Sequence, residues 1–154
     1  MLATPEIIET KAEPAAVIRV TIARNEMAKV FGPTAGELMT ELASQGVKPV
    51  GAVFAHHLMM SPGIFDFELG VKVSAPVQVS GRVKPGELPA AKVARTVYTG
   101  PYEGLPSAWG EFDTWMEANG LKQGDDLWEL YSVGPDATPD PSKWTTELYR
   151  PLKP

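Results

Sequence analysis

Alternating hydrophobic and polar residues mark a strand at residues 127–133. Trp128 and Leu130 point to one face of that strand while Glu129 and Tyr131 point to the other, because successive strand side chains lie on opposite faces. Five further segments are rich in the β-branched and aromatic residues that favour strands. The predicted strands cover residues 16–22, 50–56, 64–71, 92–98, 127–133 and 144–150.

Two other segments carry hydrophobic residues at helical spacing. The first helix is predicted to follow Gly32-Pro33-Thr34, and the second to cover residues 107–119. Their hydrophobic stripes are Ala35, Leu38, Met39 and Leu42 in the first, and Trp109, Phe112, Trp115 and Met116 in the second. Each stripe ends at a glycine followed by an aliphatic residue, Gly46-Val47 or Gly120-Leu121, which is the pattern of a left-handed C-terminal cap.

The order of these elements is strand-helix-strand-strand, repeated once. Equivalent positions are spaced almost evenly: Gly120 lies 74 residues after Gly46, and Tyr131 lies 75 residues after His56. We therefore predict an α+β fold of two pseudo-symmetric βαββ units in a barrel-like sheet arrangement with a central ligand groove. The single domain 1–154 would comprise one half at about 5–75, a Pro- and Gly-rich linker at about 76–89, and a second half at about 90–152.

Composition narrows the classes of function. The chain has 154 residues, a net charge of −5 and no cysteine. A negative surface has no general attraction for nucleic acid or anionic lipid, and the lack of cysteine excludes disulfides and thiolate chemistry. We see neither a signal peptide nor an apolar run long enough to span a membrane, so a cytoplasmic protein without nucleic-acid or membrane partners is predicted.

The polar faces of the predicted strands combine carboxylates with phenol rings. In residues 127–133 this face carries Glu129 and Tyr131, and in residues 144–150 it carries Glu147 and Tyr149. Simple exposure to solvent would explain the carboxylates, but it does not explain why tyrosines lie beside them. If the two halves meet along these faces, they enclose a cleft with aromatic walls and an acidic floor.

Several segments of the second half resemble the GyrI-like domain, the effector-binding module of multidrug-sensing regulators of the AraC and MerR types, which also occurs as a free-standing protein. The resemblance covers about residues 5–152 and is carried by residues 98–102 (YTGPY), 128–131 (WELY), 135–139 (PDATP) and 146–152 (TELYRPL). It is weaker in the first half, where Phe54 and His56 occupy the places of Glu129 and Tyr131, while Glu68 occupies that of Glu147.

The resemblance implies that Glu129 contacts the positive charge of lipophilic, cationic aromatic compounds, for sensing or sequestration. The ligand-binding residues predicted on this basis are Glu129, Tyr131, Glu147, Tyr149, Tyr98, Tyr102, Phe54, His56 and Glu68. Two alternatives stay open. One is a cofactor-free hydrolase that opens strained electrophilic rings of DNA-alkylating compounds, with Glu129 and Tyr131 as its acid/base groups. The other is a protein-interaction module of the gyrase-inhibitor type. No metal site and no cofactor are predicted.

Overall fold

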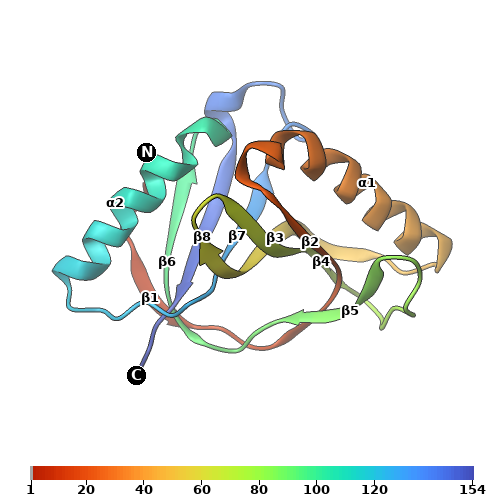
Figure 1. Cartoon of the computed structure of the whole chain (residues 1–154), viewed down its shortest axis with the longest axis horizontal. Helices are drawn as coiled ribbons and strands as arrows, with labels where there is room; N and C mark the ends of the chain where they lie inside the picture. The colour runs from red at the N-terminus through yellow and green to blue at the C-terminus, as the bar shows by residue number, and fades with distance from the viewer. Residues whose placement is uncertain (1) are drawn as a thin grey trace. The chain divides into compact units, whose positions relative to one another are not determined.

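The computed structural model describes residues 2–154, and the side chains of these residues except 59 and 60. Eight strands, two α-helices and three short 3-10 helices make up this part of the chain (Figure 1). In order they are β1 (Glu6–Glu9), β2 (Glu13–Ala23), η1 (Arg24–Glu26), α1 (Met27–Ser44), β3 (Pro49–Ser61), β4 (Ile64–Val73), β5 (Val83–Leu88), β6 (Lys92–Thr99), η2 (Tyr102–Gly104), α2 (Leu105–Ala118), β7 (Leu127–Val133), η3 (Pro141–Lys143) and β8 (Thr145–Pro151).

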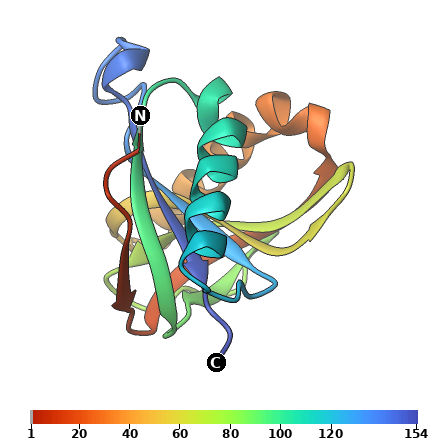
Figure 2. The ribbon, with the colours of Figure 1, turned by 90° about the vertical axis from the view of Figure 1, so that its left-hand side faces the viewer.

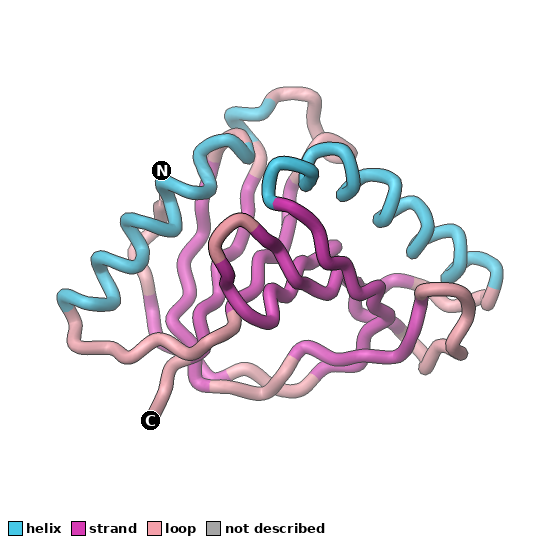
Figure 3. The backbone as a smooth tube through the Cα atoms, in the orientation of Figure 1, coloured by secondary structure: helices cyan, strands magenta, loops and turns pink. Residues whose placement is uncertain are grey.

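The chain forms two compact units that contain the same numbers of strands and α-helices. Residues 11–90 form one unit, and residues 91–154 form the other together with the N-terminal segment that ends at Thr10. Each unit contains one long helix and four strands. Figure 3 colours the helices cyan and the strands magenta. Both units follow the predicted order, β2-α1-β3-β4 in the first and β6-α2-β7-β8 in the second. The predicted α+β fold class is therefore confirmed.

In the C-terminal unit, α2 packs on one face of an antiparallel sheet with the strand order β1-β6-β8-β7 (Figure 2). The side chains buried between α2 and the sheet are Ala94, Tyr98, Ala108, Phe112, Met116 and Leu148. Five of these six come from the sheet or from the stripe predicted for the second helix. The hydrophobic face of α2 therefore orients this helix, and with it every side chain that α2 directs at the strands.

In the other unit, α1 packs on the sheet formed by β3, β4, β2 and β5 in that order. Leu38 and Leu42 of α1 are fully buried, as are Ile18, Phe67 and Leu69 of the strands. The helix begins at Met27, six residues before Pro33, although the sequence favoured a start just after this proline. Pro33 has no N–H to donate to the carbonyl group of Lys29, four residues earlier. The loss of this hydrogen bond costs little stability, because Lys29 is exposed and lies close to the start of the helix.

Both helices end in the predicted left-handed cap. Gly46 and Gly120 each have a φ of 68°. The amide of the next residue then reaches back to the last turn: Val47 donates to the Leu42 carbonyl at 3.0 Å, and Leu121 donates to the Met116 carbonyl at 3.0 Å. These bonds define the Schellman motif, in which a hydrophobic residue folds back onto the helix.

Two of the strands were not predicted from the sequence. β1 pairs with β6, and β5 pairs with β2, so residues 83–88 of the expected linker belong to a sheet. β5 contains Pro85 and Gly86, which argue against a strand when the sequence is considered alone. Proline is tolerated because β5 is an edge strand of its unit. Gly86 is required because any side chain there would overlap Val17.

Candidate functional site

Glu129 lies in the middle of β7 with its side chain on the α2 side of the sheet. In the register of β7 and β8 it is directly opposite Leu148, which belongs to the hydrophobic core under α2. Only 8% of Glu129 is exposed to solvent. A carboxyl group at a core-facing position of a strand is unusual, because ionised carboxylates are rarely buried without a partner.

Two aromatic side chains hold the carboxyl group of Glu129. The indole Nε1 of Trp109, on α2, donates to Oε2 at 2.7 Å, and the hydroxyl of Tyr131 donates to Oε1 at 2.7 Å. Burial raises the pKa of Glu129 above its usual value, and these two hydrogen bonds oppose that effect. Among the residues that the structure describes, no lysine, arginine or histidine forms an ion pair with Glu129.

A second layer of aromatic rings lies over Tyr131. The ring of Tyr102, on η2, contacts the edge of Tyr131 with centroids 5.8 Å apart, and it also packs against Trp144 with centroids 4.9 Å apart. Trp144 is anchored by a 2.9 Å hydrogen bond from its Nε1 to the carbonyl of Thr138. Because these two rings sit on loop and 3-10 segments, they are easier to displace than residues inside the sheet.

Tyr98, a predicted ligand contact, instead supports the turn that carries Tyr102. Its ring is buried in the core under α2, and its hydroxyl donates to the Pro101 carbonyl at 2.7 Å. A side chain at Gly104 would overlap that hydroxyl, which explains the glycine. Tyr98 therefore acts through the position of η2 and presents no open surface.

Glu147 and Tyr149 lie on the opposite face of this sheet from Glu129. The register places Trp128 opposite Tyr149 and Leu130 opposite Glu147, so these residues share the face that points away from α2. The expectation that one face carries Glu129, Tyr131, Glu147 and Tyr149 together is wrong. Alternation was correct within each strand, but it does not give the register between strands.

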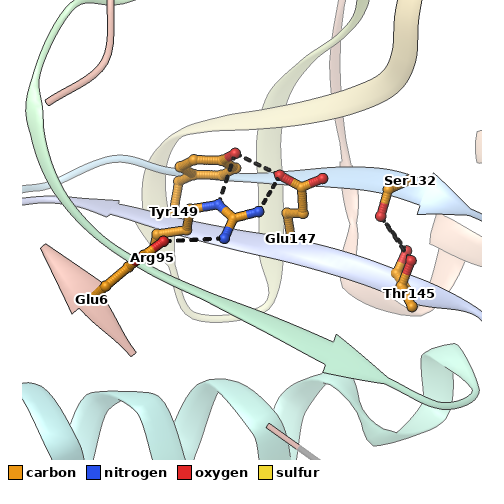
Figure 4. Close-up of polar contacts among 6 residues, drawn as sticks. All are labelled: Glu6, Arg95, Ser132, Thr145, Glu147 and Tyr149. Carbon is orange, nitrogen blue, oxygen red and sulfur yellow. Dashed lines mark hydrogen bonds and ion pairs between the residues drawn. The ribbon is translucent and has the colours of Figure 1, made fainter. Parts of the chain in front are cut away.

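Glu147 already has a cation within the chain (Figure 4). Its Oε1 accepts hydrogen bonds from Arg95 Nη2 at 2.9 Å and from the Tyr149 hydroxyl at 2.6 Å, and Arg95 also pairs with Glu6 at 3.4 Å. Partial burial alone would lower the pKa of Arg95, but its hydrogen bonds to Tyr149 and Glu147 raise it overall, so Arg95 stays charged. The charge of Glu147 is thus compensated within the chain, whereas Glu129 has only uncharged hydrogen-bond partners.

The three remaining predicted residues lie in the other unit. His56 is directly opposite Glu68, and Lys84 approaches Glu68 at 3.8 Å. Phe54 is opposite Gly70 and completely buried, and a side chain at Gly70 would overlap it. Phe54 is therefore a core residue and presents no wall to a ligand.

The registers of the two units also change which residue corresponds to Glu129. Glu68 is opposite His56 in the first unit, and Glu147 is opposite Leu130 in the second, so His56 corresponds to Leu130 and Ala55 to Glu129. The sequence had favoured Phe54 at that place. His57, one residue further, packs against Phe65 and Phe67 on the face opposite to His56, as strand alternation predicts. The first unit has no carboxylate at the position of Glu129.

Two surface hollows of the structure lie away from Glu129. One of about 600 Å³ is lined by Lys92, Gly120, Leu121, Lys122, Leu152, Lys153 and Pro154. The other, of about 590 Å³, is lined by Glu41, Gln45, Val47, Pro76, Gln78, Val79 and Ser80. Neither contains an aromatic residue. Within residues 2–154 there is no cluster of three metal-ligating side chains, and no helix there is both long and apolar enough to cross a membrane.

Sequence and structure comparisons identify the class of protein to which these features belong. Residues 3–153 match the GyrI-like small molecule binding domain, and the chain belongs to this family. The resemblance seen in the sequence is thus confirmed, and binding of a small molecule is the function of this class of domain. The comparison with curated proteins finds no match.

Solved structures show the same fold at low sequence identity. The C-terminal domain of EcmrR is 19% identical, with a TM-score of 0.85 and 97% of both chains covered. EcmrR in its complex with DNA is 21% identical with a TM-score of 0.84, and the present chain spans 57% of that longer chain. SAV2435 bound to tetraphenylphosphonium is 13% identical with a TM-score of 0.71, covering 98% of this chain and 94% of that one.

Proposed function

We propose that this protein binds lipophilic aromatic cations in the cytoplasm, with Glu129 as the counter-charge. The observation that supports this most directly is that Glu129 is only 8% exposed and that the two hydrogen-bond partners of its carboxyl group are uncharged. Leaving a carboxylate buried without a cation costs about 3–5 kcal/mol in proteins. A cationic ligand that contacts Glu129 offsets the cost of having the carboxyl group ionised, so the site favours such ligands over neutral ones.

The aromatic residues around Glu129 supply the rest of the proposed site. Trp109 and Tyr131 hold the carboxyl group, while Tyr102 and Trp144 form the layer above Tyr131. An aromatic cation that displaces this layer or stacks on it gains about 0.5–2 kcal/mol from each cation–π contact. The proposed site therefore contains Trp109 and Trp144 in addition to Tyr131 and Tyr102, the two tyrosines that were predicted from the sequence. Glu147 and Tyr149 are not included, because they lie on the other face, where Arg95 neutralises Glu147 and donates a hydrogen bond to Tyr149.

The biological role that we propose is sensing or sequestration of such compounds. A structural neighbour, EcmrR, is a DNA-bound regulator in which this fold occupies only part of the chain. Another neighbour was solved with tetraphenylphosphonium, a lipophilic aromatic cation. This neighbour supports tetraphenylphosphonium as the first ligand to test.

The test is a calorimetric titration of tetraphenylphosphonium into the wild type, Glu129→Gln and Glu111→Gln. Glutamine keeps the shape of Glu129 and removes its charge, while Glu111 is an exposed carboxylate on α2 and serves as the matched control. We expect Glu129→Gln to raise Kd at least tenfold, equivalent to about 1.4 kcal/mol, and Glu111→Gln to leave it unchanged. Equal affinities for the wild type and Glu129→Gln would refute the role of Glu129.

One observation favours a second candidate function, ring-opening hydrolysis. Burial raises the pKa of Glu129, and the Tyr131 hydroxyl is in hydrogen-bond contact with it, which is a suitable pair for acid/base chemistry. Incubation with cyclopropane-bearing alkylating compounds, followed by mass spectrometry, distinguishes the two functions. Ring-opened product that forms with the wild type and not with Glu129→Gln would establish turnover. If the compound stays unchanged, hydrolysis is refuted and binding is the only function of the two that stands.

A further inference from the structure

We propose that Glu129 carries a proton on Oε1 in the free protein, that Trp109 determines this position, and that a bound cation expels the proton. The inference rests on the proposed function, because it describes how the same site acquires its charge. It also assigns a role to Trp109, whose spacing on α2 indicates only a core residue.

The two contacts of Glu129 are not chemically equivalent. An indole nitrogen can donate a hydrogen bond but cannot accept one, so Oε2, at 2.7 Å from Trp109, has to act as an acceptor at all times. The Tyr131 hydroxyl donates to Oε1 at 2.7 Å when the carboxyl group is ionised. A hydroxyl can also accept, so a protonated Oε1 can donate to the Tyr131 oxygen across the same contact. Of the two oxygens, only Oε1 has a partner that can accept a hydrogen bond from it, so a proton on Oε1 is hydrogen-bonded while both contacts are kept.

The groups around Glu129 favour this neutral state. Tyr131 lies on the same strand as Glu129, Trp109 donates to it from α2, and Leu148 is directly opposite it on β8. The pKa of Tyr102, on η2, is raised by burial and by the nearby charges of Asp136 and Glu129. Asp136, in the loop after β7, acts on Tyr102 and adds a further negative charge nearby. Within the described part of the chain no cationic group pairs with the carboxylate, so ionisation in the free protein would leave one buried, uncompensated charge.

A permanent cation changes this balance because it compensates the charge of the ionised form. Binding then transfers the Oε1 proton to solvent, and Tyr131 becomes the donor to Oε1. Below the pKa of Glu129 in the free protein, affinity for the cation should increase tenfold for each rise of one pH unit. A neutral ligand of similar shape leaves the proton in place, so its affinity should not depend on pH. The site would therefore select its ligands by charge.

Two measurements test the protonation itself. The first is the infrared difference spectrum of the free wild type minus Glu129→Gln, in which we expect the carbonyl stretch of a protonated carboxyl group. The second is calorimetry with tetraphenylphosphonium in buffers of different ionisation enthalpy, in which we expect close to one proton released per ligand. Triphenylphosphine oxide serves as the neutral comparator and should release none.

Trp109→Phe tests the positioning role. The hydrogen bond from the Trp109 indole lowers the pKa of Glu129. Its loss in Trp109→Phe should therefore raise this pKa and move the pH midpoint of tetraphenylphosphonium binding upward. Trp115→Phe, the same change on the same helix at a residue that packs on Phe112, should leave the midpoint in place. A merely structural role for Trp109 would weaken binding equally at every pH, and that result would overturn the assignment.

Each outcome separates the inference from the function on which it rests. Binding without proton release, or a free protein that lacks the carboxyl band, would contradict the proton on Oε1 while the proposed function survives. If tetraphenylphosphonium does not bind at any pH, the proposed function fails, and the infrared band alone then decides whether Glu129 is protonated.

Discussion

Replacing Glu129 by glutamine should stabilise the protein, by an amount that depends on pH. Glutamine is almost the same size as glutamate, and its amide can accept from Trp109 through oxygen and donate to the Tyr131 oxygen through nitrogen. The substitution therefore keeps both contacts of the buried side chain. What it removes is the ability of this position to ionise inside the core.

The sign of the effect follows from the pKa of Glu129 in the folded and unfolded states. Burial makes the pKa of Glu129 in the folded protein higher than its ordinary value of 4.5. Between these two pKa values the folded state holds more protons than the unfolded state, so the wild type loses stability as the pH rises through this window. Each unit of difference between the two pKa values costs about 1.4 kcal/mol. In a domain of this size, that free energy corresponds to about 3–6 °C in Tm.

The assay is thermal unfolding of the wild type and Glu129→Gln at a series of pH values from acidic to mildly alkaline. We expect the two melting temperatures to be closest in acid, to diverge as the pH rises, and to stay a constant distance apart above the folded pKa. Other titrating groups cancel in this difference, and Glu111→Gln shows the effect of removing an exposed carboxylate. A difference that does not vary with pH, or a wild type that gains on the mutant as the pH rises, would refute the reasoning.

Three further changes test other parts of the structure. Arg95→Met should destabilise the protein by about 2–3 kcal/mol in urea unfolding, because it leaves the half-buried Glu147 without its cation. Adding Glu147→Gln to this variant should recover most of the lost stability. No recovery would mean that the two residues are not coupled. Gly120→Ala should lower the free energy of unfolding by about 1 kcal/mol, since φ is 68° at this residue. Gly110→Ala, in the middle of α2 where a side chain has space, should be neutral or stabilising. Equal effects of the two substitutions would contradict the left-handed cap. Burial lowers the pKa of His57 to about 4, so the unfolded state takes up a proton first and stability should fall by about 3 kcal/mol as the pH drops from 6.5 to 4. His57→Leu should lose much less in urea unfolding over the same range, and an equal loss would place the acid sensitivity elsewhere.

Local patterns in the sequence predicted most of the fold. Helical spacing located α1 and α2, and the Gly-aliphatic pairs predicted both Schellman caps, because each feature depends only on residues within one or two turns. β1 and β5 were missed for the same reason. β1 has only four residues, most of them exposed, and β5 contains Pro85 and Gly86, so pairing with β6 and β2 determines these strands rather than their own composition.

The candidate site was predicted only in part, because it depends on contacts between strands. Glu129 and Tyr131 were found from alternation along β7, and the structure brings them together. Their separation from Glu147 depends on the register of β7 and β8, and a shift of one residue in register reverses the faces. Trp109 was assigned to the core since an indole ring at that spacing packs like any large hydrophobic side chain. Nothing in the sequence indicates that its N–H meets a carboxylate.

A crystal structure of the complex with tetraphenylphosphonium would test the central claim most directly. We predict that the phosphonium centre lies near the Glu129 carboxyl group, with a phenyl ring against Tyr102 or Trp144 at a centroid distance of up to about 6 Å. A ligand bound beside Glu147 and Arg95 instead, with the hydrogen bonds of Glu129 unchanged, would contradict the account.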